Sequence, residues 1–163
     1  MQTTKIGLIC ILILGSCTVM LDDMEETRLI KPYRDPYFEP SPTMRFNLLK
    51  HHIQYIKDYS HLIPDSKVPK EIILAQGILE SDGGRSNAAR NKNNHFGIYF
   101  GDTLAYFDSP ARCFEYHSKL LNRRYFVQTT DCGVWANNLE ANGYATDTMY
   151  AETLISIIEQ IRL

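Results

Sequence analysis

Apolar residues recur at helical spacing soon after residue 43 of the chain. The first helix is predicted by four apolar residues that share one helical face: Phe46, Leu49, Ile53 and Ile56. A second helix is predicted to begin near Pro69, and its residues 72–79 are apolar along most of their length. It is predicted to end at Gly83-Gly84, because glycine favours the backbone conformation that closes a helix.

The pattern then changes from helical to β-type. Residues 95–100 and 103–107 are rich in aromatic and β-branched residues and flank a two-residue Gly-Asp connection. Two such runs with a two-residue connection are typical of a hairpin. We therefore expect a small β-lobe after the second helix.

Helical patterns return in the last third of the chain. Ser109 followed by Pro110 indicates a helix start, with serine as the N-cap and proline in the first turn. Two further helices are predicted, one ending near Asn142 and one beginning near Asp147. The sequence thus predicts a mainly α (α+β) fold of about five helices with one small hairpin.

Composition and charge narrow the function classes. The chain has 163 residues, 44% of them hydrophobic, which suits one domain with a real core. Its net charge of −2 gives no electrostatic reason to expect nucleic acid as a partner. No cofactor and no metal site are predicted.

The N-terminus has the pattern of a lipoprotein signal. Lys5 precedes an apolar run that extends from Ile6 to Leu14, which suits a signal sequence and is too short to span a bilayer. The string Leu14-Gly15-Ser16-Cys17 resembles the bacterial lipobox, in which cleavage occurs before a cysteine that is then lipidated. An ordinary secretory signal and an uncleaved anchor are the alternatives.

These features divide the chain into three parts. Residues 1–16 are the predicted signal peptide, and residues 17–42 hold the lipidated Cys17 and a proline-rich tether. Residues 43–163 are the predicted catalytic domain.

Two cysteines remain in the predicted domain. Cys113 and Cys132 form either a disulfide, which an envelope compartment permits, or two unrelated thiols. Cys113 lies four positions before His117, but nothing nearby completes a metal site. We expect the other candidate ligands to be surface residues of the first helix and its connection: His51, His52 and His61.

Glu80 is the candidate general acid. It falls in the last turn of the second predicted helix, where apolar neighbours and the partial negative charge of the helix end both oppose ionisation. A general acid needs a carboxyl group that holds its proton near neutral pH. On the residues alone, a solvated surface glutamate is the alternative.

Four blocks in one order carry a family resemblance. They are residues 75–81 (AQGILES), 93–98 (NNHFGI), the helical segment 107–121, and 143–147 (GYATD) with Tyr150-Ala151 after it. Together they resemble the glucosaminidase family of glycoside hydrolases (family 73), which includes flagellar muramidases and bacterial autolysins. The blocks span most of the predicted domain.

The resemblance implies a lysozyme-like fold that hydrolyses the β-1,4 bond after N-acetylglucosamine in peptidoglycan. It places Glu80 at the family's general-acid position and Tyr144 at that of its active-site tyrosine. For both Tyr144 and Phe96, packing in the core is the alternative. The residues expected to bind substrate on the floor between the lobes are Asn94, Phe96, Gly97 and Tyr99, the last of which stands where the family commonly has lysine.

The second catalytic group is not settled by the resemblance. Family members with a longer β-lobe place a second acid there, whereas this lobe offers only Asp102 and Asp108. Asp102 is either that carboxylate or simply part of the turn. A substrate-assisted route, with the acetamido group of the sugar as nucleophile and Tyr144 stabilising positive charge, needs Glu80 alone.

The expected function is therefore that of a peptidoglycan hydrolase in the bacterial cell envelope. Its partners would be glycan strands and, through the lipid on Cys17, a membrane. A non-catalytic glycan-binding module on the same fold and a lytic transglycosylase are the alternatives.

Overall fold

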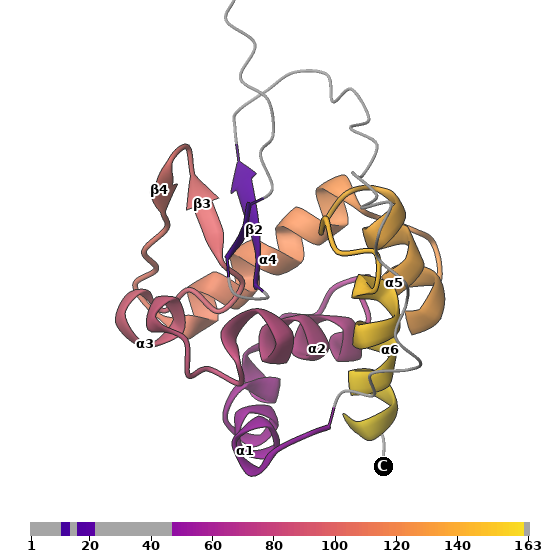
Figure 1. Cartoon of the computed structure of the whole chain (residues 1–163), viewed down its shortest axis with the longest axis horizontal. Coiled ribbons are helices and arrows are strands. Elements are labelled where there is room, and N and C mark those ends of the chain that lie inside the picture. The colour runs from indigo at the N-terminus through magenta and orange to yellow at the C-terminus, as the bar shows by residue number, and fades with distance from the viewer. Residues whose placement is uncertain (1–10, 14–15, 22–46, 162–163) are drawn as a thin grey trace, which may run out of the picture.

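The structure, a computed structural model, describes residues 11–13, 16–21 and 47–161 (Figure 1). Most of the predicted signal peptide and tether therefore lies outside the described residues. Within them, the mainly helical fold with a small hairpin is confirmed. The helices are α1 (Lys50–Tyr59), the 3-10 turn η1 (Ser60–Leu62), α2 (Lys70–Ser81), α3 (Asn87–Lys92), α4 (Pro110–Arg124), α5 (Cys132–Ala141) and α6 (Tyr150–Ile161).

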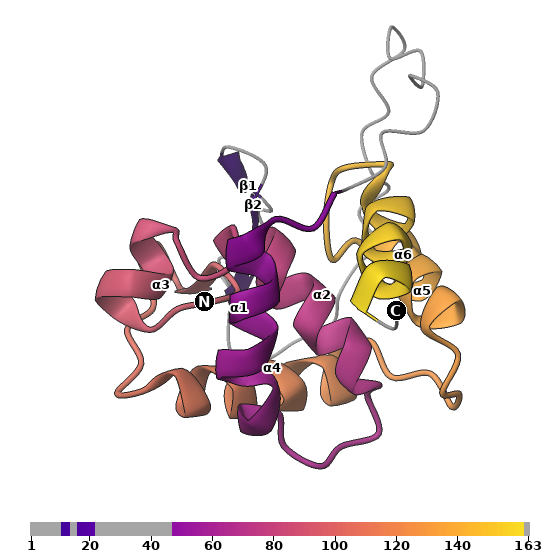
Figure 2. The same ribbon diagram turned by 90° about the horizontal axis from the view of Figure 1, so that it is seen from below.

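Helix α2 is the central element of the domain. Its apolar run is buried almost without interruption, as the sequence predicts, and it packs against α1, α5 and α6. Figure 1 shows α3 and the hairpin on one side of α2, with α5 and α6 on the other. Viewed from below, α1 lies beside α2 (Figure 2). Asp82 ends α2 in the left-handed conformation, with a φ of 51°.

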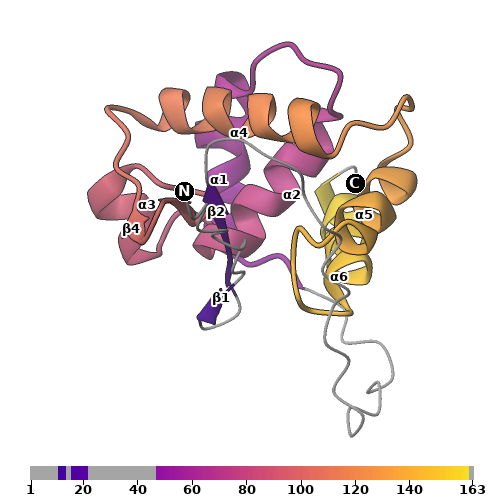
Figure 3. The same cartoon turned by 90° about the horizontal axis from the view of Figure 1, so that it is seen from above.

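Helix α4 closes the domain along one side. Seen from above, it runs from the end near α3 and the hairpin to the end near α5 (Figure 3). Its start is the one predicted, because the Ser109 side chain accepts a hydrogen bond from the backbone N–H of Arg112 at 3.4 Å. The large buried side chains that fill the space between the helices include Trp135, Phe114 and Leu121.

The β-lobe is a short antiparallel hairpin of β3 (Ile98–Phe100) and β4 (Thr103–Leu104). Tyr99 pairs with Leu104 and Phe100 with Thr103. The hairpin is shorter than the predicted runs, because residues 94–96 turn inward and are buried.

Two further strands precede the helical domain. They are β1 (Ile11–Ile13) and β2 (Ser16–Leu21), and β2 pairs in parallel with β3, so that Val19 lies opposite Ile98. We expected these residues to lie outside the catalytic fold, whereas in the whole chain they extend the exposed edge of β3. Cleavage before Cys17 stays a prediction.

The predicted disulfide is not formed. Cys113 and Cys132 are both buried thiols and are not bonded to each other. Cys113 lies in the first turn of α4, and the rest of that helix extends about 16 Å along its axis before the chain turns toward α5. Burial raises the pKa of the Cys113 thiol to about 12, and its sulfur accepts a hydrogen bond from the backbone N–H of His95 at 3.4 Å.

Two further expectations differ from the structure. Helix α3 was not predicted, because its six residues, NAARNK, are mostly polar and carry no apolar repeat. His52 was expected at the surface but is buried, with only 3% of its surface exposed. Among the described residues, no helix combines the length and the apolar character needed to cross a membrane.

Candidate active site

Glu80 lies in the last turn of α2 and is one of the few ionisable residues buried in the described part of the core. Only 3% of its surface is exposed. A carboxyl group taken out of water needs a hydrogen-bond partner, and Tyr150 supplies one by donating its hydroxyl proton to Glu80 Oε1 at 3.2 Å. Tyr150 is the first residue of α6, so the packing of α6 on α2 positions this contact.

Behind Tyr150 the hydrogen bonds continue into the core. Gln76 Nε2 donates to the Tyr150 hydroxyl oxygen at 2.9 Å. Gln76 Oε1 lies 3.0 Å from His117 Nε2. Gln76 and His117 are both fully buried, and they come from α2 and α4. Four side chains from three helices thus form one chain of hydrogen bonds, which we call the relay: Glu80, Tyr150, Gln76 and His117.

The amide oxygen of Gln76 and the ring of His117 determine the direction of the hydrogen bonds in the relay. The amide oxygen of Gln76 can only accept, so the proton of His117 must lie on Nε2. Burial lowers the pKa of His117 to about 3, which keeps the imidazole neutral and leaves its Nδ1 without a proton. Every donor in the relay therefore points toward Glu80.

The opposite orientation of the Gln76 amide is less favourable. It would donate to His117 Nε2 and force the imidazole proton onto Nδ1, which has no hydrogen-bond partner. A buried N–H without a partner costs roughly 1–3 kcal/mol. The orientation present here leaves only a lone pair at Nδ1.

Aromatic rings enclose the relay. Phe96 stacks on His117, with ring centres 3.7 Å apart and an angle of 9° between the planes. Tyr144 stacks on Tyr150 at 5.5 Å and meets His117 edge-on at 6.1 Å. These rings exclude water from the hydrogen bonds and leave each side chain little freedom to rotate.

The structure places Tyr144 and Phe96 against members of the relay that ends at Glu80. Tyr144 and Phe96 are, however, buried, with 1% and 0% of their surfaces exposed. In this arrangement they pack around the relay. Direct contact of either ring with a sugar stays a prediction.

Asn94 braces the hairpin. Its side-chain nitrogen donates to the carbonyl oxygens of Ile98 at 2.8 Å and Ala105 at 3.0 Å, and its oxygen accepts from the Ile98 N–H at 2.9 Å. Only 1% of its surface is exposed. Its amide therefore fixes the path of the β-lobe.

The other predicted site residues lie in the hairpin. Gly97 has a φ of 60°, in the left-handed region that favours glycine, and lets the chain turn from Phe96 into β3. Tyr99 is half-buried in β3. Asp102 is exposed in the turn, whereas Glu80 is buried.

Three of the four relay residues were not predicted as site residues from the sequence: Gln76, Tyr150 and His117. Gln76 interrupts the apolar run of α2, and Tyr150 belongs to the apolar face of α6. A polar side chain within a fully apolar stretch is itself a signal, because a buried amide must find partners. The position of Gln76, one helical turn before Glu80, is the clue that the sequence contained.

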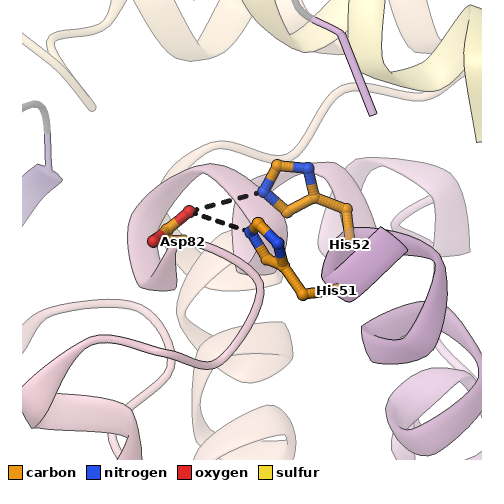
Figure 4. A group of neighbouring side chains, drawn as sticks. All are labelled: His51, His52 and Asp82. Atoms are coloured by element: carbon orange, nitrogen blue, oxygen red, sulfur yellow. Dashed lines mark hydrogen bonds and ion pairs between the residues drawn. The ribbon is translucent and has the colours of Figure 1, made fainter. Parts of the chain in front are cut away.

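A second polar cluster lies beside the end of α2. Figure 4 shows His51 and His52, at the start of α1, pointing toward Asp82. His51 Nε2 and His52 Nε2 lie 3.2 Å and 3.5 Å from Asp82 Oδ1. Arg85 holds the other carboxylate oxygen, with Nη2 at 2.9 Å from Oδ2. The cluster ties the start of α1 to the turn that follows Glu80.

The three side chains are close enough to be considered as metal ligands. The hydrogen bonds of His52 argue against it, because its Nδ1 accepts the backbone N–H of Leu49 at 3.0 Å. Burial, followed by the charge of His51, lowers the pKa of His52 and keeps it neutral, so its one proton lies on Nε2. A nitrogen that carries a proton cannot bind a metal, and the cluster is better described as a hydrogen-bonded clamp.

Comparison with known families matches most of the described domain. The model of the glucosaminidase family, described as mannosyl-glycoprotein endo-beta-N-acetylglucosaminidase, matches residues 56–163. This range includes Glu80 and the rest of the relay.

Similar proteins include bacterial enzymes. The chain is 29% identical over 146 residues to the exo-glucosaminidase LytG of Bacillus subtilis (strain 168), covering 71% of this chain and 50% of LytG. The glycoside hydrolase domain of FlgJ from Salmonella typhimurium superposes with a TM-score of 0.57 and 27% identity, covering 68% of this chain and 88% of that one. The N-acetylmuramoyl-L-alanine amidase of Staphylococcus aureus gives a TM-score of 0.63 and 25% identity, covering 76% of this chain and 46% of that one. This chain thus spans about half the length of LytG and of the amidase chain.

Proposed function

This chain belongs to the glucosaminidase family of glycoside hydrolases, and on that premise we propose that it cleaves peptidoglycan at the β-1,4 bond after N-acetylglucosamine. Glu80 is the general acid of this proposal. The observation that carries it is a buried carboxyl group at the end of α2 that receives a hydrogen bond from Tyr150. An acid that is held in one orientation can deliver its proton to one atom of a bound substrate.

The bond cleavage begins with proton transfer. Glu80 gives its proton to the glycosidic oxygen, the bond from that oxygen to the anomeric carbon breaks, and positive charge develops on the sugar ring. Most glycoside hydrolases use a second carboxylate at this point. The candidate in the β-lobe, Asp102, is exposed in the hairpin turn.

We therefore assign the nucleophile to the substrate. The acetamido oxygen of N-acetylglucosamine attacks the anomeric carbon as the glycosidic bond breaks, forming a cyclic intermediate. Water then attacks the same carbon and reopens the ring. The Glu80 carboxylate takes the proton of that water, which restores the acid. Tyr144 is the group that we expect to stabilise the positive charge.

The substrate assignment is supported by family membership and by the names of the relatives. LytG is named an exo-glucosaminidase, and the FlgJ domain is described as a glycoside hydrolase. A cell-wall substrate requires a site of action outside the cytoplasm, which agrees with the signal-like N-terminus.

We also propose that Cys17 carries a lipid that anchors the protein to a membrane. The support is the string Leu14-Gly15-Ser16-Cys17 at the end of an apolar run. Cys17→Ala should abolish incorporation of labelled fatty acid into the protein. Wild-type labelling of this variant would exclude the anchor.

The decisive experiment is product analysis. The purified full-length chain is incubated with peptidoglycan sacculi, and the new glycan ends are identified by mass spectrometry, with Glu80→Gln as the control. We expect new reducing N-acetylglucosamine ends that are absent with the variant. Anhydro-muramyl ends would identify a lytic transglycosylase, and binding without any product would identify a glycan-binding module. Either result would overturn the proposal.

A further inference from the structure

The proposed function gives no task to the two polar residues behind Tyr150. Gln76 and His117 are fully buried and cannot touch the sugar. We propose that they are positioning residues, which act through Tyr150 to determine which oxygen of Glu80 carries the catalytic proton. This proposal rests on the assignment of Glu80 as the general acid.

The argument starts from the single proton of the Tyr150 hydroxyl. Its oxygen already accepts the amide N–H of Gln76 at 2.9 Å, so its own proton is directed to Glu80 Oε1. If the Gln76 amide turned around, its oxygen could no longer accept the hydrogen bond that His117 Nε2 donates over 3.0 Å. His117 thus sets the orientation of Gln76, and Gln76 sets that of the Tyr150 hydroxyl.

This order has a consequence for the acid. A protonated carboxyl group carries its hydrogen on one of two oxygens. Oε1 already accepts the hydrogen bond from the Tyr150 hydroxyl, so a proton on Oε1 would point at the proton of Tyr150. The acid proton is therefore kept on Oε2, in the one position from which it can be delivered repeatedly to the same substrate atom. After transfer, the same donated hydrogen bond stabilises the negative charge left on Glu80.

The far end of the relay keeps the same charge across the working pH range. Burial lowers the pKa of His117 to about 3, so the ring stays neutral and keeps its proton on Nε2. The stacked ring of Phe96, 3.7 Å away, holds the imidazole in place. The relay therefore orients Glu80 without gaining or losing a proton itself.

The first test measures kcat, KM and the pH–rate profile of Tyr150→Phe and Gln76→Leu. We expect kcat to fall by about 10- to 100-fold in Tyr150→Phe and by a smaller factor in Gln76→Leu, with KM little changed, because Gln76 is fully buried and Tyr150 acts through its hydrogen bond to Glu80. The alkaline limb of the profile should move to higher pH, by about one unit in Tyr150→Phe, since the ionised carboxylate loses a donor. A purely structural role would not move this limb.

The second test asks whether Gln76 acts through Tyr150. In a double-mutant cycle, Gln76→Leu should add no further loss of kcat once Tyr150 is phenylalanine. At the end of the relay, His117→Gln retains an N–H donor and should keep most of the activity, whereas His117→Leu should not.

Tyr55→Phe is the matched control, because it removes another buried hydroxyl, bonded to His95 at 3.2 Å, that lies beside α2. Its kcat and pH profile should be those of the wild type.

Thermal unfolding followed by circular dichroism establishes that each variant is folded, and the kcat and alkaline limb of Tyr150→Phe keep the test decisive if Gln76→Leu does not fold. Wild-type kcat and pH profile in folded Gln76→Leu, or additive losses in the double mutant, would overturn the relay. If the relay fails while Glu80→Gln is inactive, the proposed function stands. If Glu80→Gln is itself active, the assignment of the acid fails first.

Discussion

The Tyr150 hydroxyl lies 3.2 Å from Glu80 Oε1, although the two residues are 70 positions apart in the chain. Glu80 is in the last turn of α2 and Tyr150 begins α6, so this hydrogen bond, like the one from Gln76 to Tyr150, connects the central helix with the last helix. The geometry of the candidate acid therefore depends on how α6 docks on α2. Changes in the core between these helices should affect catalysis as well as stability.

Replacement of Glu80 by glutamine tests the acid role directly. Glutamine retains the size of the side chain and can still accept the hydrogen bond of Tyr150, but it has no proton to transfer. We expect kcat on sacculi to fall by a factor on the order of 10² to 10⁴. The midpoint of thermal unfolding should change little, because glutamine is a good helix former. A folded, fully active Glu80→Gln protein would contradict the mechanism.

The identity of the second group can be tested with a pair of variants. A catalytic carboxylate at Asp102 would make Asp102→Asn lose activity by about 10²- to 10⁴-fold. Because Asp102 is exposed in the turn, we expect a loss below about 10-fold, within the range of a peripheral substitution. Tyr144→Phe should lose more than Asp102→Asn if the substrate supplies the nucleophile. The reverse order in kcat would assign the role to Asp102.

The sequence predicts the elements of this fold better than the connections between them. Ser109 and Pro110 mark the start of α4, and Gly83-Gly84 follows the end of α2, because capping chemistry is local. Helix α3 escaped prediction because its polar residues carry no apolar repeat. The burial of His52 also escaped, since its ring packs against the turn at Asp82 and Gly83, which is distant along the chain and close only in the folded state.

The same limit applies to the site. Glu80 was predicted as the acid because it lies in a block of residues that resembles a known family. The partners of Glu80 come from α6, α2 and α4, and no local pattern states that these helices meet at Tyr150 and Gln76. Of the two alternatives left open for Cys113 and Cys132, a disulfide or two unrelated thiols, the structure has two free, buried thiols.

Asn94 is expected to contribute to stability more than to sugar binding. Asn94→Asp removes both donors to the carbonyl oxygens of Ile98 and Ala105 and places a carboxylate beside them. We expect the free energy of unfolding, measured in urea, to fall by about 2–4 kcal/mol. Asn137→Asp, at an exposed amide that donates to the Gly133 carbonyl, is the matched control and should change it by less than about 0.5 kcal/mol. Equal stability of the two variants would show that the brace is unimportant.

Two buried histidines should make the protein less stable in mild acid. Burial lowers the pKa of His117 to about 3 and that of His95 to about 4, while in the unfolded chain both titrate near 6.5. Between these values the unfolded state binds protons that the folded state does not, so stability is complete above pH 6.5 and falls as the pH drops toward 4. We expect the free energy of unfolding to decrease by about 2 kcal/mol per histidine from pH 7 to pH 5.

The contribution of His117 can be separated with His117→Gln, which retains a donor but does not titrate. Urea unfolding of this variant at pH 7 and pH 5 should show a smaller difference than the wild type, by about the amount expected for one histidine. An unchanged pH dependence would mean that His117 is not the group responsible.

The cluster of His51, His52 and Asp82 should not bind zinc. For His52 Nε2 to become a ligand, its proton would have to move to Nδ1, where it would face the N–H of Leu49 and break the hydrogen bond between them. The Asp82 carboxylate is also engaged by Arg85, with Nε at 3.1 Å and Nη2 at 2.9 Å from Oδ2. Zinc binding would therefore have to break the hydrogen bond between Leu49 and His52 and the contacts between Asp82 and Arg85 in the turn after Glu80.

The measurement is thermal unfolding of the full chain with EDTA and with a small excess of Zn²⁺. A ligand that binds only the folded state raises the unfolding temperature, and we expect no such rise. Asp82→Asn is the matched control, because asparagine tolerates the left-handed conformation of this residue, with its φ of 51°, and cannot supply a carboxylate. A rise in the wild type that disappears in Asp82→Asn would identify a metal site and contradict the proton assignment of His52. An equal response of both proteins would place any zinc elsewhere and leave the cluster as a clamp between α1 and the end of α2.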